Sequence, residues 1–247
     1  GAQAFAGGAT GPGSQLWSAT GGEGDPDLGL GRSFQVLGDA EGGRSTLAVS
    51  EAGDDQAGPD AGRVQGYVAA QNMPASTLVT ALYDSNEQHL GRDLGVYEPG
   101  DFNADGYDDL VIASRYWPAG DNTGRVQVAY GSPSGPGVPL WAVWGSDPGD
   151  RLGDDHAIAD VDGDGYADLA ITAQGVAAPS GQVVGEVRLY LGGPTGLQTS
   201  PAWTATGVDP DERLLSALEL ADVNCDGRPD LVVSAYDGQV HVAVYLG

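Results

Sequence analysis

Three short segments of the chain carry oxygen-bearing side chains at the same four positions. They begin at Asp101, Asp160 and Asp222, and in each one the first, third, fifth and ninth residues are Asp or Asn and the sixth is Gly. Calcium takes about six to eight oxygen ligands at roughly 2.3–2.6 Å, so a short loop that curls around it must alternate carboxylates and add a backbone carbonyl. The glycine permits the sharp turn. The spacing therefore predicts three calcium-binding loops, with a carbonyl donated from position seven.

An EF-hand begins in the same way, but it needs Glu at position twelve and a helix after the loop. Position twelve is Ile112, Ile171 or Val233 here, within β-type apolar runs. Pro229, just ahead of the third run, fits a helix interior poorly. We therefore expect a strand after each loop, with each site closed by its ninth residue: Asp109, Asp168 and Asp230.

The charges in these loops favour an ion over ordinary turns. The ligand positions concentrate ten carboxylates, three, four and three in the successive loops. Bare carboxylates this close together would repel one another. Three divalent ions would change the formal net charge from −25 to −19. The alternative is that the aspartates only cap local backbone, but three copies with one spacing favour the metal.

The loops belong to a longer repeat. Their first aspartates are 59 and 62 residues apart, and an eroded copy begins at Asp39, one residue short and with Thr46 at the closing position, so we expect no ion there. An alternating strand, a Gly- and Pro-rich turn and a Trp-bearing strand keep the same phase, at Trp17, Trp141 and Trp203. Four short strands in about 60 residues match one propeller blade, and the tryptophans are expected to pack between blades.

The repeat predicts a single all-β domain over 1–247, a β-propeller with about four visible four-stranded blades. The repeats cover 32–85, 90–145, 152–207 and 213–247, and N-terminal strands within 1–20 complete a blade. The first strands of the repeats are expected around Val36, Val96, Ile158 and Leu218, and the second strands begin at Leu47, Leu110, Leu169 and Leu231. Two further strands are expected at Gln3 and over 240–246. The ring is either closed with four blades, part of a larger ring such as a seven-bladed one, or completed by another chain.

The pattern Asp-x-Asp/Asn-x-Asp-Gly-x-x-Asp-Leu resembles the calcium loops of FG-GAP repeats, the blades of integrin-α-type propellers. The sequence departs from that family at Leu90-Gly91, Leu152-Gly153 and Leu214-Leu215, where Phe-Gly would stand. The resemblance implies calcium in hairpin loops on one rim, and an adhesive or carbohydrate-binding function. The ligands that it implies are Asp101, Asn103, Asp105, Tyr107 and Asp109, then Asp160, Asp162, Asp164, Tyr166 and Asp168, then Asp222, Asn224, Asp226, Arg228 and Asp230.

Composition excludes several partners. A net charge of −25 argues against nucleic acid and anionic membranes. No apolar run approaches the roughly 20 residues that span a bilayer, and no leader-like segment opens the chain. The single cysteine, Cys225, cannot form an internal disulfide, and its place in the loop is taken by Ala104 and Gly163 elsewhere, so it is expected only to be small.

A second candidate site lies in the loop 115–121, on the rim opposite the acidic loops. Irregular loops on a rigid scaffold often carry specificity. This loop offers a cation, two aromatic rings and a carboxylate suited to a sugar or a peptide: Arg115, Tyr116, Trp117 and Asp121.

These features predict a calcium-binding module, outside the cell or at its surface, that recognises a glycan or an extracellular protein and is not an enzyme. None of the three histidines shares a repeat position or sits in a nucleophile motif. Two alternatives stay open, an architectural segment of a larger surface protein or fibre, and a secreted hydrolase that uses acidic residues. Self-association would be a further way to complete the ring.

Overall fold

The structure is a computed structural model of the chain. It describes residues 2–5, 15–19, 34–37, 45–51, 63–69, 77–83, 100–118, 120–133, 136–138, 140–207, 213–236 and 239–247. The eroded loop at Asp39 and the strand predicted around Val96 lie outside these residues. Within them, no helix has the length and apolar character needed to cross a bilayer.

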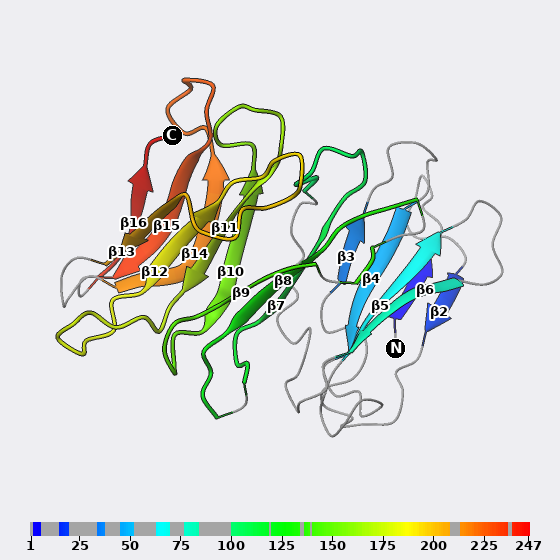
Figure 1. Cartoon of the computed structure of the whole chain (residues 1–247), viewed down its shortest axis with the longest axis horizontal. Helices are drawn as coiled ribbons and strands as arrows, with labels where there is room; N and C mark the ends of the chain where they lie inside the picture. The colour runs from blue at the N-terminus through cyan, green and yellow to red at the C-terminus, as the bar shows by residue number, and fades with distance from the viewer. Residues whose placement is uncertain are drawn as a thin grey trace.

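The described residues form sixteen strands and no helix, which confirms the all-β prediction (Figure 1). The strands are β1 Ala2–Phe5, β2 Gln15–Ala19, β3 Phe34–Leu37, β4 Ser45–Glu51, β5 Arg63–Ala69, β6 Thr77–Tyr83, β7 Leu110–Ser114, β8 Arg125–Ala129, β9 Trp141–Trp144, β10 Leu152–Ala159, β11 Asp168–Ala173, β12 Glu186–Tyr190, β13 Trp203–Thr206, β14 Arg213–Ala221, β15 Asp230–Tyr236 and β16 Val240–Tyr245.

Strands β3 to β16 form four antiparallel sheets, and within each sheet the strands follow chain order. Two sheets have four strands, β3-β4-β5-β6 and β10-β11-β12-β13, and two have three, β7-β8-β9 and β14-β15-β16. Gly100 forms an isolated antiparallel bridge with Asp109 just ahead of β7. The strands that follow the second and third acidic loops begin one residue earlier than predicted, because Asp168 and Asp230 already pair with Ala159 and Ala221.

The second strand of a sheet is buried more completely than the third. All five residues of β7 are buried, and so are all six of β11, whereas the first four residues of β8 alternate between partly buried and buried. Strands covered on both faces read as continuous apolar runs, and half-buried strands alternate. The runs that begin at Leu110 and Leu169 therefore identify the strands packed between neighbouring sheets.

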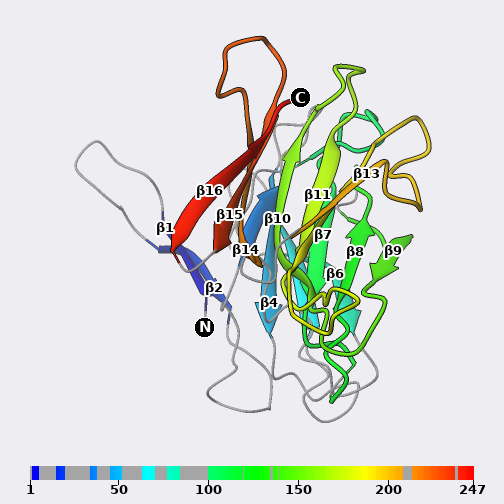
Figure 2. The same cartoon turned by 90° about the vertical axis from the view of Figure 1, so that its left-hand side faces the viewer.

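The hydrophobic core consists of clusters between successive sheets. One joins β3–β5 to β7 and β8, a second joins β7–β9 to β10–β12, and a third joins β10–β13 to β14–β16. The sheets accordingly stack side by side in chain order, as Figures 1 and 2 show from two directions. Each blade depends on its neighbours for burial, as in other repeat folds.

The stack of sheets is not closed in this structure. Strands β1 and β2 form a separate two-stranded sheet, which lies at the end of the molecule opposite β16 (Figure 1). The number of blades in the ring, its closure and the completion of a blade by residues 1–20 therefore stay predictions.

Candidate metal centres

The three acidic loops share one backbone conformation. Their sixth residues, Gly106, Gly165 and Gly227, have φ of 87°, 93° and 92°, in the left-handed region that glycine adopts without strain. The fourth residues lie in the same region, with φ of 52° at Ala104, 77° at Gly163 and 63° at Cys225. Two left-handed residues per loop curl the chain back on itself. Of these two positions, sequence reasoning identified only the sixth, the glycine.

The backbone conformation, and not the available space, restricts which residue types can occupy the fourth position of the loops. A Cβ atom built on Gly163 meets no atom within 4 Å. A left-handed conformation costs an ordinary L-residue roughly 1–2 kcal/mol. The expectation that Cys225 needs only to be small is therefore incomplete, because its φ also matters.

We expect Cys225→Gly to unfold at the same temperature as the parent or at a higher one, because glycine relieves the positive φ. Cys225→Val should have a free energy of unfolding about 1–2 kcal/mol lower than that of Cys225→Gly, since a β-branched residue is strained there. Thermal unfolding of both variants measures the difference. Equal unfolding midpoints for Cys225→Val and Cys225→Gly would contradict this view of the loop.

Loop side chains hold this conformation through hydrogen bonds to loop backbone. In the second loop, the Asp160 carboxylate accepts bonds from the Asp164 N–H at 3.1 Å and the Gly165 N–H at 2.9 Å. Asp162 Oδ1 accepts from the Asp164 N–H at 3.2 Å, and Asp164 Oδ1 accepts from the Tyr166 N–H at 3.0 Å. The first and third loops repeat these bonds through Asp101, Asn103 and Asp105 and through Asp222, Asn224 and Asp226.

The ninth residue of each loop is buried and ties two strands together. Asp168 is 1% exposed. Its Oδ2 accepts from the Val161 N–H at 2.7 Å, and its Oδ1 accepts from the Gly192 N–H, just after β12, at 2.8 Å. Asp109 and Asp230 make the same two bonds in their own blades. Sequence reasoning assigned these aspartates to the ion alone and missed the tie to the glycines that follow the third strands, Gly131, Gly192 and Gly247.

The second loop brings three carboxylates to one point. Asp160, Asp162 and Asp168 each offer an oxygen, and the three atoms lie within 4.8 Å of one another. Each carboxylate oxygen has two lone pairs, so an oxygen that accepts one N–H bond can still bind a cation. The donor set is all oxygen and mostly anionic, which is the set that calcium prefers. These residues fit a divalent cation.

Burial makes the closing aspartates costly to ionise without a counter-charge. Burial raises the pKa of Asp109 to about 7, although the N–H groups of Gly131 and Phe102 oppose this, and the nearby carboxylates of Asp101 and Asp105 raise it further. The pKa of Asp168 is raised for the same reasons, burial first. A bound cation would offset both the burial and the repulsion.

Calcium affinity at the first loop should therefore depend on pH near neutrality. The folded pKa of Asp109 lies above the unfolded value, so without metal its contribution to stability is present at acidic pH and lost as pH rises through 7. Calcium needs the ionised form, so its affinity changes in the opposite direction. Between pH 8 and pH 6 the ionised fraction of Asp109 falls roughly tenfold, and calcium affinity should fall with it. Titration against a chromophoric chelator at both pH values tests this, and equal affinities would contradict it.

Adjacent loops also contact each other through backbone. The Ala167 N–H donates to the Asp101 carbonyl at 3.1 Å, and the Gly193 N–H donates to the Phe102 carbonyl at 3.0 Å. Pro229 holds the place of Ala167 in the third loop and has no N–H to donate. The first and second loops are thus joined by a bond that the second and third cannot make.

The remaining predicted ligands lie within the same loops. Tyr107, Tyr166 and Arg228 follow the left-handed glycines, and their N–H groups donate to the fifth residues. Their carbonyl oxygens stay predicted ligands.

The loop 115–121 gathers cations and aromatic rings at the other end of β7. Arg115 Nη1 lies 3.1 Å from Asp154 Oδ1, and its guanidinium lies 4.8 Å from the centre of the Tyr116 ring. Arg125 lies 5.0 Å from the Trp117 ring centre, and Arg151 lies 6.0 Å from that of Tyr116. Asp121 is exposed, and its carbonyl accepts from the Gly149 N–H. Sequence reasoning missed Arg125 and Arg151, which come from other segments and carry no local signal.

The region of the first two acidic loops matches known protein families. Residues 101–171 match the FG-GAP-like repeat family, and residues 157–189 match the FG-GAP repeat family. The chain is 35% identical over 146 residues to phosphatidylinositol-glycan-specific phospholipase D of Bos taurus, which covers 55% of this chain and 17% of that protein. It is 32% identical over 157 residues to integrin alpha-IIb of Homo sapiens, covering 59% and 15%. It is 28% identical over 197 residues to integrin alpha-5 of Xenopus laevis, covering 74% and 18%. The chain thus spans less than a fifth of the length of these relatives.

Proposed function

Because the chain carries FG-GAP repeats of the integrin type, we propose that it is a calcium-stabilised module that recognises a ligand outside the cell or at its surface. The observation that supports this most is the threefold repetition of one acidic loop with one hydrogen-bond network. The three carboxylates that meet in the second loop support a divalent ion there. Calcium would cross-link each hairpin and hold adjacent blades in register.

The proposed ions are held by the fifteen predicted ligands, five in each loop. The first, third, fifth and ninth side chains supply oxygens, and position seven supplies a carbonyl. Sites of this kind in extracellular modules bind calcium with dissociation constants of about 10⁻⁴–10⁻³ M. Such sites would be filled at the calcium concentrations outside cells, which supports the proposed location.

The proposed ligand surface is the cluster of Arg115, Tyr116, Trp117, Arg125 and Arg151, which we call the arginine–aromatic cluster. Guanidinium groups over aromatic rings form a flat surface that stacks on sugars or peptide side chains and binds carboxylates. Only ten Lys and Arg are present against 35 acidic residues. Three arginines around two rings thus favour an acidic glycan or an acidic peptide, and Asp121 would contribute at the edge.

Binding to glycan and peptide arrays, with calcium and with chelator, tests this proposal. Tyr116→Ala should abolish binding at the arginine–aromatic cluster without changing the number of bound ions. Asp164→Ala, on the opposite rim, serves as the matched control: it should lose an ion and keep most of the binding in calcium. Binding that is unaffected by Tyr116→Ala would exclude this surface.

A second candidate function is hydrolysis, because one relative is named as a phospholipase D. The match covers 17% of that protein, and the acidic side chains of the present loops are already engaged with loop backbone. We therefore propose a non-enzymatic role. Turnover of a panel of phosphodiester and glycoside substrates, lost in Asp160→Ala, would favour the enzyme instead.

A further inference from the structure

The first and second acidic loops are joined next to residues that we propose as ligands of different ions. The Ala167 N–H donates to the Asp101 carbonyl at 3.1 Å. Asp101 is the first proposed ligand of the first loop, and Ala167 directly precedes Asp168, the closing ligand of the second. A change in the backbone at either site therefore reaches the other through one bond, which we call the loop–loop bond.

A second path runs between the two closing aspartates through Phe102 and a pair of glycines. The Phe102 N–H donates to Asp109 Oδ2 at 2.8 Å, and the Phe102 carbonyl accepts from the Gly193 N–H at 3.0 Å. The neighbouring Gly192 N–H donates to Asp168 Oδ1 at 2.8 Å. The two carboxylates that would close the first and second ion sites thus lie at the ends of one hydrogen-bonded backbone path.

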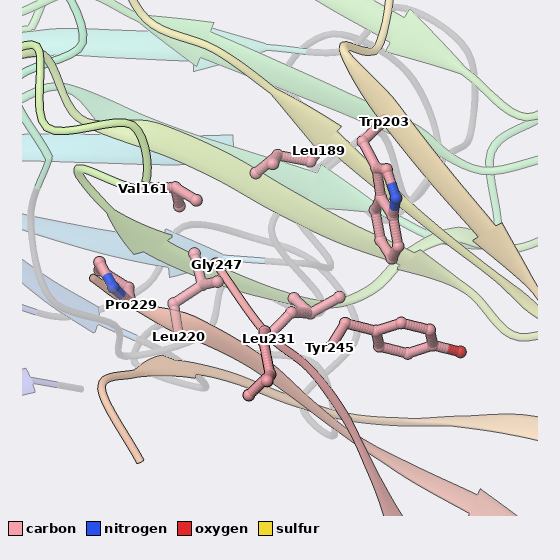
Figure 3. A pocket seen from close by; sticks show the side chains of 9 residues that line it. Val161, Leu189, Trp203, Leu220, Pro229, Leu231, Tyr245 and Gly247 are labelled. Carbon is pink, nitrogen blue, oxygen red and sulfur yellow. The ribbon is translucent and has the colours of Figure 1, made fainter. Parts of the chain in front are cut away.

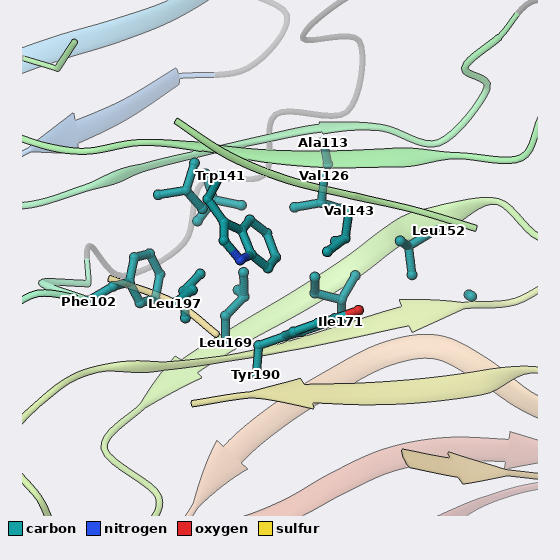
Figure 4. Packing of buried hydrophobic residues seen from close by; sticks show 13 residues of the cluster. Phe102, Ala113, Val126, Trp141, Val143, Leu152, Leu169, Ile171, Tyr190 and Leu197 are labelled. Carbon is teal, nitrogen blue, oxygen red and sulfur yellow. The ribbon is translucent and has the colours of Figure 1, made fainter. Parts of the chain in front are cut away.

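The residues of this path are tightly packed. A Cβ atom built on Gly192 would lie 2.9 Å from the Phe102 carbonyl oxygen and 2.2 Å from the Ala167 carbonyl oxygen, so Gly192 is in close backbone contact with both loops. The Phe102 side chain is fully buried, in the cluster where Trp141 packs edge-on against Tyr190 with ring centres 5.2 Å apart (Figure 4). Close-packed groups transmit strain, so order imposed on one loop restricts the other.

The second and third loops cannot form the loop–loop bond. Pro229 holds in the third loop the place of Ala167 and has no N–H to donate. The two loops still meet, because Val161 of the second loop and Pro229 line one pocket between β10–β13 and β14–β16 (Figure 3). The first pair of loops carries three and four ligand carboxylates, and the second pair four and three. Repulsion between carboxylates therefore does not distinguish the two pairs, whereas the loop–loop bond does.

Ordering one of two joined loops lowers the cost of ordering the other. With an ion bound at the second loop, Asp168 stays ionised and the backbone that carries the Ala167 N–H is fixed. That N–H then holds the Asp101 carbonyl, so less conformational entropy remains to be lost when the first loop closes on its own ion. The effect is reciprocal, because each ion must change the affinity of the other site by the same factor.

We propose that the first and second calcium sites bind cooperatively as one unit and that the third site is not part of this unit. The inference rests on the proposed function, because it concerns the same three ions. The free energy of about one backbone hydrogen bond would raise the affinity of either site roughly 2- to 10-fold when the other is filled. The sheets β7–β9 and β10–β13 would consequently become fixed to each other over a narrower range of calcium concentration than independent sites allow.

Chains with disabled loops measure this coupling. Asp105→Ala, Asp164→Ala and Asp226→Ala disable the first, second and third loops, so one substitution leaves a pair of sites and two leave a single site. Competition against a chromophoric chelator gives each calcium-binding constant. The two-ion constant of a pair divided by the product of its single-site constants is the coupling factor. This factor should be roughly 2- to 10-fold larger for the first and second sites than for the second and third.

Ala167→Pro removes the loop–loop bond at a position where the third loop already holds proline. It should lower the coupling factor of the first pair to that of the second pair. A direct effect of proline on the second site cancels, because the single-site constant of the same variant enters the ratio. Ala167→Ser, which keeps the N–H, is the matched control and should keep the coupling.

A second measurement needs only one disabled loop. At half-saturating calcium, native mass spectrometry should find fewer singly loaded chains for Asp226→Ala than for the same chain with Ala167→Pro, because cooperative sites fill together. This comparison holds even if chains with two disabled loops fail to fold.

Two results would overturn the proposal while leaving the calcium sites in place. One is an equal coupling factor for the two pairs of loops, and the other is a coupling factor that Ala167→Pro leaves unchanged. If the parent chain bound no calcium at all, the proposed function itself would fail, and the coupling with it.

Discussion

Asp168→Ala should lower the free energy of unfolding by about 2–4 kcal/mol even when calcium is chelated. The substitution leaves the buried N–H group of Gly192 and the partly buried one of Val161 without their acceptor, and each such loss costs about 1–3 kcal/mol. Relief of the repulsion from Asp160 and Asp162 offsets part of this cost. With calcium present the loss should be larger, because the second ion is lost as well. Chemical denaturation in chelator and in calcium measures both effects.

Asp164→Ala is the matched control for that variant. Asp164 is exposed, and its Oδ1 accepts a bond from the exposed turn at Tyr166. In chelator this variant should unfold almost as the parent does, and in calcium it should lose the contribution of one ion. If Asp168→Ala also had the parent's free energy of unfolding in chelator, the ninth aspartate would not be the structural tie described above.

Chelation of calcium should lower the thermal midpoint of the parent chain by roughly 15–30 °C. At a calcium concentration about 100 times the dissociation constant, each ion that binds only the folded state contributes about 2.7 kcal/mol. For a chain of about 250 residues, 1 kcal/mol moves the midpoint by about 2–4 °C. Differential scanning calorimetry with and without EGTA measures the shift. Added magnesium, which demands octahedral geometry at shorter distances, should restore little of it, and a midpoint that does not respond to EGTA would contradict calcium-stabilised loops.

The repeat could be predicted from the sequence because its signals are local. The acidic loops, the apolar runs from Leu110 and Leu169 and the tryptophan strands recur with one phase, and each predicts its own element without reference to the others. The strands following the loops and the strands at Trp141 and Trp203 accordingly lie where the phase places them.

The ties between elements could not be predicted, because they join residues far apart in the sequence. The closing aspartates bond the glycines after the third strands across separations of 22, 24 and 17 residues. Arg125 and Arg151 reach the rings of Trp117 and Tyr116 from other segments. Nothing in the loop sequence indicates either contact.

The left-handed fourth position of the loops was missed for a different reason. Ala104 and Cys225 are not residue types that favour positive φ, so their identity conceals their conformation. Gly163 at the same place in the second loop was the available signal. Blade number was equally out of reach, because every interface in a repeat fold is local and a count of repeats does not specify how the ends meet.

Native mass spectrometry in calcium and after chelation counts the ions on the intact chain, so it shows whether the three acidic loops hold calcium. We expect three calcium ions on the parent, two on Asp164→Ala and none after chelation. Fewer than three ions on the parent, or the same number on Asp164→Ala as on the parent, would contradict it.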